Sequence, residues 1–175
     1  MEEVVRPGRG RFGIVGAAAL VVVTAACGPP SEVQLGGVAE DGVTFAPLEG
    51  DQPLVPGSQG GFHVWVKLRF TGFEPGKHTV QRTARRTRDE RLVLTTRTGI
   101  AVGEPDASGT WETPDPLPSF MCPAPIGVSV IDEPIRFEVE VLDEAGQAVA
   151  HDGAVATPHC PEGEQAQFCQ QICSG

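Results

Sequence analysis

The stretch from residue 62 to residue 70, FHVWVKLRF, constrains the fold more than any other part of the chain. Its even-numbered residues are apolar, and its odd-numbered residues are polar or amphipathic. Strict period-two alternation over this length predicts a β-strand that buries its even-numbered face against a core. Residues 135–142 repeat the pattern, and no long helical periodicity accompanies either stretch.

Turn-forming residues divide the rest of the chain into short segments. The sequence contains 22 glycines and 16 prolines, which favour many short strands over long helices. Further strands are expected at 43–45, 77–86, 91–102, 127–131 and 147–157, while the proline-rich segment 114–125 is predicted to be a loop. About seven to nine strands indicate an all-β antiparallel sandwich over residues 42–157, with a partly closed barrel as the alternative.

The strand that ends in Leu142-Asp143-Glu144-Ala145-Gly146 and then reverses resembles the closing hairpin of immunoglobulin-like bacterial surface domains. The resemblance implies an immunoglobulin-like β-sandwich. Two features depart from true immunoglobulin domains. The chain has no tyrosine, and no cysteine lies on the 62–70 strand to form the usual bridge between sheets.

The first 27 residues follow the pattern of an export signal. A head with three arginines precedes an apolar run over residues 12–26, which is shorter than the roughly 20 residues of a membrane-spanning helix. The junction Val23-Thr24-Ala25-Ala26-Cys27 resembles the lipobox of bacterial lipoproteins, with Thr24 where leucine is usual. An ordinary signal peptide and an uncleaved membrane helix are the alternatives.

The lipobox resemblance implies that residues 1–26 are removed and that a lipid is joined to the Cys27 sulfur. The protein would then be exported and anchored to a membrane. Gly28 after the cysteine implies the outer membrane if the host has one, and otherwise the outer face of the cell membrane. Residues 27–41 are expected to form the lipid-anchored N-terminus and a flexible tether.

The charge of the chain excludes some classes of partner. The formal net charge is −10, and removal of the leader would make the protein one unit more negative. A protein this acidic does not bind nucleic acid through its overall field. An envelope protein remains a suitable partner, whereas an anionic surface polymer could bind only through a local cluster of positive charge.

Four cysteines besides Cys27 are predicted to form two disulfides: Cys122, Cys160, Cys169 and Cys173. An even number of cysteines in an exported domain favours disulfides, although three connectivities are possible. Residues 158–175 would form a stapled tail, with Cys169 and Cys173 on one face of a short helix. A zinc site built from these thiols and His159 is the less favoured alternative, and no cofactor is expected other than the lipid on Cys27.

The segment between Lys77 and Arg97 concentrates positive charge on the predicted hairpin. Five arginines in it are candidates for binding an anionic partner: Arg82, Arg85, Arg86, Arg88 and Arg91. Guanidinium groups hold carboxylates and phosphates well because they bind them with two parallel hydrogen bonds. The simpler interpretation is that these arginines form a solvated edge or pair with acidic residues of the same chain.

His63 and Trp65 are neighbours on the polar face of the 62–70 strand, and together they are candidates for a ligand platform. No nucleophile elbow, zinc-protease motif or phosphate-binding loop occurs in the chain, so no enzyme activity is predicted. The sequence therefore predicts a membrane-anchored envelope lipoprotein with a binding or structural role. A small periplasmic metal-binding protein or enzyme, and an accessory subunit of an envelope complex, are the alternatives.

Overall fold

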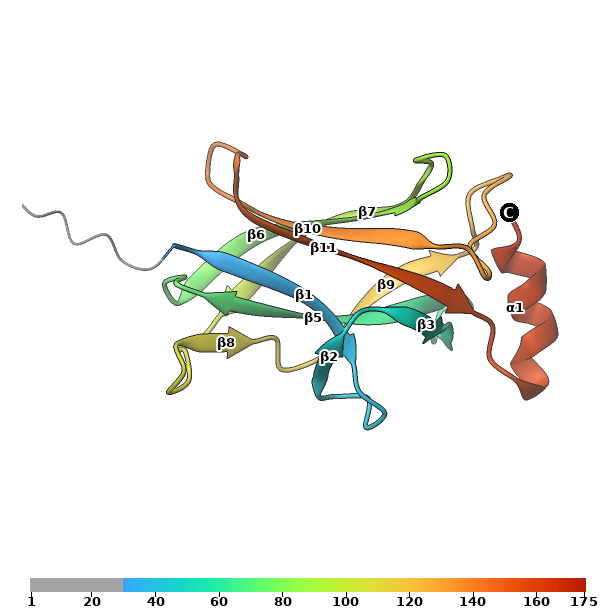
Figure 1. Cartoon of the computed structure of the whole chain (residues 1–175), viewed down its shortest axis with the longest axis horizontal. Helices are drawn as coiled ribbons and strands as arrows, with labels where there is room; N and C mark the ends of the chain where they lie inside the picture. The colour runs from blue at the N-terminus through green and yellow to red at the C-terminus, as the bar shows by residue number, and fades with distance from the viewer. Residues whose placement is uncertain (1–29) are drawn as a thin grey trace, which may run out of the picture.

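A computed structural model describes residues 30–175 as two β-sheets that face each other, with a short helix at one end (Figure 1). The predicted signal peptide and the lipidation site Cys27 lie outside the described residues. The prediction of a mostly β fold with two sheets is confirmed.

The first sheet is built around β5 (Phe62–Thr71), the strand that the alternation predicts. β1 lies beside one half of β5, and β9 lies beside the other half on the opposite side. β2 extends the sheet beyond β1, while β4 and β8 each pair with one end of β5. The bounds are β1 Glu32–Val38, β2 Phe45–Pro47, β4 Val55–Pro56, β8 Thr110–Glu112 and β9 Leu117–Cys122.

The second sheet has the order β3-β11-β10-β6-β7. The predicted hairpins are both present, β6 with β7 and β10 with β11. β3 runs parallel to β11, so this sheet is not purely antiparallel. The bounds are β3 Gly50–Pro53, β6 Gly76–Arg86, β7 Leu92–Val102, β10 Ile135–Leu142 and β11 Ala148–His159.

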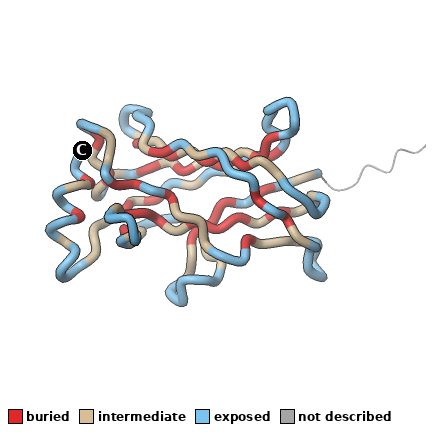
Figure 2. The backbone as a smooth tube through the Cα atoms, turned by 180° about the vertical axis from the view of Figure 1, so that it is seen from behind, coloured by how far each residue is buried: buried red, intermediate tan, exposed pale blue. Residues whose placement is uncertain are grey.

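The core lies between the two sheets, and the buried residues follow the strands on their facing sides (Figure 2). All five even-numbered residues of β5 are buried, and so are Ile135, Phe137, Val139 and Val141 of β10. Both alternating stretches therefore place the predicted faces in the core. Burial of a phenylalanine or leucine side chain contributes roughly 1.5–3 kcal/mol to folding.

Two disulfides fasten the C-terminal tail to the sandwich. A single 3₁₀ turn (Gly163–Gln165) leads into α1 (Ala166–Cys173), so the predicted short helix is present. Cys122 at the end of β9 pairs with Cys173, and Cys160 just after β11 pairs with Cys169. Cys169 and Cys173 are both fully buried, so one face of α1 closes the end of the sandwich.

Three expectations about individual segments are wrong. Residues 32–38 are not part of a flexible tether, because they form β1 and pair with β5. Residues 127–131 do not form a strand. The supposed loop at 114–125 contains β9, which tolerates Pro118 because this edge strand pairs only with β5.

The number of strands is also larger than expected, with eleven in the part of the chain that the structure describes. The additional ones are mostly short strands of two to four residues, such as β3 and β4. Such segments are too short for alternation to become visible in a sequence.

Candidate functional site

The five candidate arginines do not form one surface, because successive residues of a strand point to opposite faces. Arg82 and Arg86 lie on the inner face of β6 together with Ala84, and both arginines are buried. Arg85 lies on the outer face of the second sheet. The sequence cluster is therefore divided between the interior and the surface.

Most of these arginines already have partners within the chain. The Arg86 Nη2 atom lies 2.6 Å from the Asp89 carboxylate, and this hydrogen-bonded pair raises the pKa of Arg86. Arg88 pairs with Glu133 at 2.8 Å. Arg91 donates to the backbone oxygens of Ile126 and Gly127.

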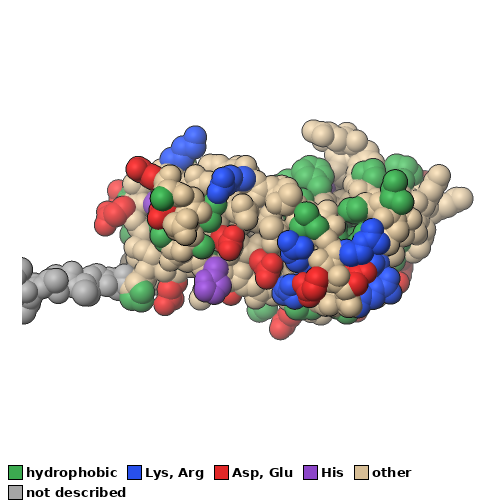
Figure 3. Space-filling view, turned by 90° about the horizontal axis from the view of Figure 1, so that it is seen from above, with side chains coloured by type: hydrophobic (Ala, Val, Ile, Leu, Met, Phe, Trp, Pro, Cys, Tyr) green, Lys and Arg blue, Asp and Glu red, His purple; other side chains and the backbone are tan. Residues whose placement is uncertain are grey.

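Figure 3 shows the molecule from above, with cationic and acidic side chains next to one another in the right half of the view. Internal pairing satisfies Arg86, Arg88 and Arg91. Arg82, Arg85 and Arg91 form no salt bridge within residues 30–175, and of these three only Arg82 is buried.

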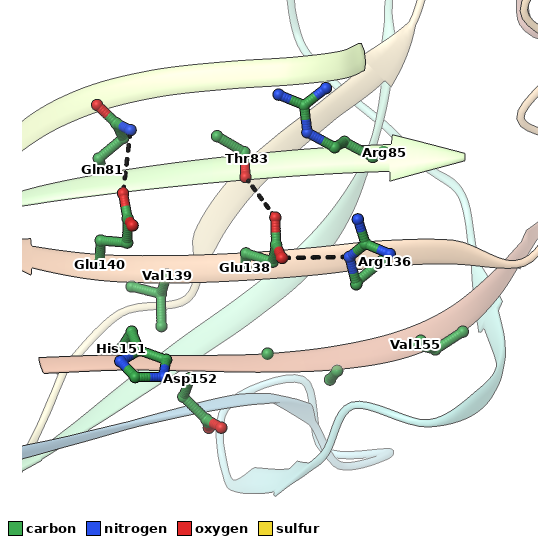
Figure 4. Close-up of a pocket in the computed structure, with 12 residues that line it drawn as sticks. Gln81, Thr83, Arg85, Arg136, Glu138, Val139, Glu140, His151, Asp152 and Val155 are labelled. Carbon is green, nitrogen blue, oxygen red and sulfur yellow. Dashed lines mark hydrogen bonds and ion pairs between the residues drawn. The ribbon is translucent and has the colours of Figure 1, made fainter. Parts of the chain in front are cut away.

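A surface hollow with a volume of about 510 Å³ lies on the outer face of the second sheet. The β10–β11 turn rises at one end of this face and the β6–β7 turn at the other (Figure 1). Polar side chains line the hollow and bond to one another across the strands (Figure 4). Two bonds cross from β6 to β10, from Gln81 to Glu140 and from Thr83 to Glu138, and a third joins Arg136 to Glu138 within β10.

These cross-strand pairs stabilise the sheet but leave few polar atoms of the hollow available to a ligand. Arg136 also pairs with Glu90 in the β6–β7 turn. The hollow is therefore a weak candidate for a specific binding site.

The sulfur atoms of the tail lie close together but are oxidised. Sγ atoms of Cys160, Cys169 and Cys173 all lie within 4.8 Å of one another, and the Cys169–Cys173 separation is 3.7 Å. Zinc needs thiolate ligands, and both disulfides consume the thiols. In this oxidised state the tail is a structural staple.

His63 and Trp65 lie next to each other on the outer face of β5, as predicted. Their rings are in edge contact, with centroids 4.2 Å apart. The predicted open platform is wrong for His63, however, because this residue is only 4 % exposed. Gly57 lies over the imidazole, at a position where an added Cβ would be 3.3 Å from Nδ1.

The loop over His63 is held in place by its own backbone. Gly57 donates to the Gly61 oxygen at 2.7 Å, and Gly60 donates to the Gly57 oxygen. Gly61 lies against the backbone of Cys122, so closely that a Cβ there would meet the Cys122 oxygen at 2.4 Å. The loop is therefore fixed between β5 and the disulfide-bonded end of β9.

Both ring nitrogens of His63 are buried without a hydrogen-bond partner. Burial lowers the pKa of His63, so the ring is neutral at pH 7 and has one donor and one acceptor. An unsatisfied buried polar group costs about 1–3 kcal/mol. Residues 30–175 supply no hydrogen-bond partner for this ring.

A hollow of about 260 Å³ lies beside the imidazole. Trp65 and the half-exposed Phe120 of β9 form its aromatic walls, and Phe120 contacts His63 with ring centroids 5.8 Å apart. Pro56 and Pro118 add apolar surface, and Ser58 and Gln59 of the covering loop add polar groups. No charged residue lines this hollow, and His63 supplies a buried polar group with no partner among the described residues.

A second hollow of about 450 Å³ lies on the other side of Trp65. Glu40 and Asp51 bring carboxylates to its wall, and both residues are exposed. Neither carboxylate forms a salt bridge with any described residue, and no lysine or arginine lines the hollow. Trp65 therefore lines both an uncharged hollow and an acidic one. We call the two hollows together the Trp65 site.

The two cationic residues on this face of β5 are already paired. Lys67 is buried, forms an ion pair with Glu112 at 2.6 Å, and donates to the Val43 oxygen. Arg69 also bonds to Glu112 and lies over the Phe45 ring at 3.9 Å. These contacts fix the 39–47 segment beside the acidic hollow.

Two components of the Trp65 site are not apparent from the sequence. Phe120 and Pro118 come from β9, which the proline content disguises, and the 56–61 loop reaches His63 only through the turn. The pairing register sets Phe120 opposite His63 and Pro118 opposite Trp65. The only sequence signal for this would have been the alternation of Leu117, Ser119 and Met121 with Pro118 and Phe120.

Comparisons with known proteins add no identification. No protein-family model matches this chain, and no curated protein matches it in sequence. Neither helix in residues 30–175 has the length and apolar composition needed to cross a membrane.

Proposed function

We propose that this protein is an exported envelope lipoprotein, anchored through Cys27, that binds a small organic ligand at the Trp65 site. The observation that carries the proposal is the His63 imidazole, which is buried beside a 260 Å³ hollow with both nitrogens unpaired. A ligand that bonded to this ring would remove a desolvation cost that the free protein bears. Ligand pockets commonly combine apolar walls with a few polar groups in this way.

The two hollows together favour a particular ligand chemistry. Trp65, Phe120 and the prolines suit an apolar ring or chain, and the carboxylates of Glu40 and Asp51 suit a positive charge. A cation near the face of a tryptophan gains about 0.5–2 kcal/mol. The ligand class is therefore an apolar molecule with an amine, which also suits the acidic charge of the chain.

Export to an oxidising compartment is supported by the leader and by two disulfides in the folded domain. The finer assignment of the sandwich to the immunoglobulin-like class is also part of this proposal. It is supported by the β10–β11 closing hairpin. The missing tyrosine corner distinguishes this chain from antibody-type domains.

The test uses two probes that share a ring and differ in charge, phenylethylamine and phenylacetate. The chain has two tryptophans, so Trp111→Phe leaves Trp65 as the only reporter of fluorescence. We expect saturable quenching by the amine, weaker quenching by the acid, and loss of this preference in Glu40→Gln/Asp51→Asn.

His63→Ala should weaken binding of both probes, because it removes the buried hydrogen-bonding group of the uncharged hollow. His151→Ala is the matched control, since His151 is exposed on the other sheet and its loss should leave binding unchanged. The proposal fails if neither probe changes Trp65 emission saturably, or if His63→Ala binds both as tightly as the parent.

A further inference from the structure

A group of polar residues interrupts the apolar core at inward-facing positions of three strands. The inner face of β7 buries Leu94, Ile100 and Val102, but Thr96 stands between them. Register places Thr96 opposite Arg82 of β6. Ser119 of β9 is buried and contacts Arg82 from the other sheet.

The Arg82 guanidinium lacks a counter-charge. It is 8 % exposed and forms two long hydrogen bonds from Nη1, both 3.3 Å, to the Pro118 oxygen and to Ser119 Oγ. Within residues 30–175 no carboxylate pairs with it. Burial accordingly lowers the pKa of Arg82.

Thr96 is also unsatisfied, because its Oγ1 atom is buried and has no hydrogen-bond partner. An unpaired buried cation costs several kcal/mol even after the surroundings relax. Neutral oxygens at 3.3 Å compensate little of that, since strong hydrogen bonds of a guanidinium are about 2.7–2.9 Å long. Residues 30–175 therefore supply no strong acceptor for this group.

The group lies at the side of the sandwich where an edge strand of each sheet is found. β7 is the last strand of the second sheet and pairs only with β6. β9 is an edge strand of the first sheet and pairs only with β5. Arg82 pairs with β7 through Thr96 and contacts β9 through Pro118 and Ser119, so it lies at the seam between two edge strands.

We propose that Arg82, Thr96 and Ser119 form a binding site for a small oxyanion, either a phosphate or a carboxylate group. The guanidinium supplies the charge and a planar set of donors, and the two hydroxyls add donors on either side. The site is separate from the Trp65 site, because Ser119 and Phe120 are consecutive residues of β9 and point to opposite faces of the sheet.

The acidic charge of the chain, −10 overall, opposes the approach of any anion. Binding must therefore come from local contacts in the desolvated seam, where they are stronger than in water. Removal of the Arg82 charge should also not unfold the protein. A buried charge without a partner is itself costly, so its replacement by a neutral side chain of similar shape removes that cost.

The experiment measures the melting temperature of the domain in phosphate, in acetate and in sodium chloride, all at one ionic strength. At tenfold excess over its dissociation constant a bound anion should raise the melting temperature by about 4 °C relative to chloride. Arg82→Gln should abolish the shift, and Arg97→Gln should keep it. Arg97 is a matched control, because it is an exposed arginine on the neighbouring strand.

A shift with phosphate but not acetate assigns the site to phosphate groups, and the reverse result assigns it to carboxylates. The proposal is overturned if neither anion shifts the parent protein, or if Arg82→Gln shows the same shift. Thr96→Val gives a second measure that preserves the charge and the volume. It should reduce the shift without abolishing it.

Discussion

The two disulfides should contribute unequally to stability, because they close chain loops of very different length. Cys122–Cys173 spans 51 residues, whereas Cys160–Cys169 spans 9. In the chain-entropy model, the longer loop stabilises the fold by about 4 kcal/mol and the shorter one by about 2.5 kcal/mol. Both bridges anchor a fully buried cysteine of α1, so the loss of packing on replacement by serine is similar.

The prediction is that Cys122→Ser/Cys173→Ser lowers the free energy of unfolding by about 1.5 kcal/mol more than Cys160→Ser/Cys169→Ser does. Urea unfolding of the two double variants and the parent measures this difference, provided that the slopes with denaturant agree. An equal or larger loss in Cys160→Ser/Cys169→Ser would refute the loop-length reasoning. It would show that the short bridge stabilises the native tail directly.

Two further predictions concern the outer face of β5. Because burial lowers the pKa of His63, the unfolded chain takes up its proton first. Stability from the neutral ring is complete above the unfolded pKa of about 6.5 and is lost as pH falls below it. When the pH is lowered from about 7.5 to about 5.5, the melting temperature should therefore fall more in the parent than in His63→Phe. Equal falls in the two proteins would contradict this. Glu112→Gln should cost about 2 kcal/mol in urea unfolding, since it leaves buried Lys67 with a neutral partner. The exposed turn variant Glu144→Gln is the control, and an equal effect of the two would contradict the prediction.

The Trp65 site shows how far sequence reasoning can reach for a binding site. Alternation along β5 puts His63 and Trp65 on one face. It does not indicate that Gly57 covers the imidazole or that Phe120 stands opposite it. The first fact depends on a turn closed by backbone bonds, and the second on a strand register. Neither leaves a periodic signal in the sequence.

The sequence shows where the arginines are concentrated, but it does not show which of them are paired. Their concentration on one hairpin is visible in the sequence, and so is the acidic excess that can neutralise them. Only the structure separates the satisfied pair of Arg86 and Asp89 from the unpaired Arg82. The distinction depends on which residues of β6 point inward and on what β9 brings to meet them.

By itself, the sequence determined the elements whose signal is local. These are the alternation of β5 and β10, the two hairpins, the short cysteine-bearing helix and the even number of cysteines for disulfides. The tertiary structure decided which cysteines pair, that residues 32–38 join the sheet, and that β9 is a strand. These outcomes depend on contacts between segments far apart in the chain. A strand without its own alternation is stabilised by the neighbour it pairs with, and the sequence does not name that neighbour.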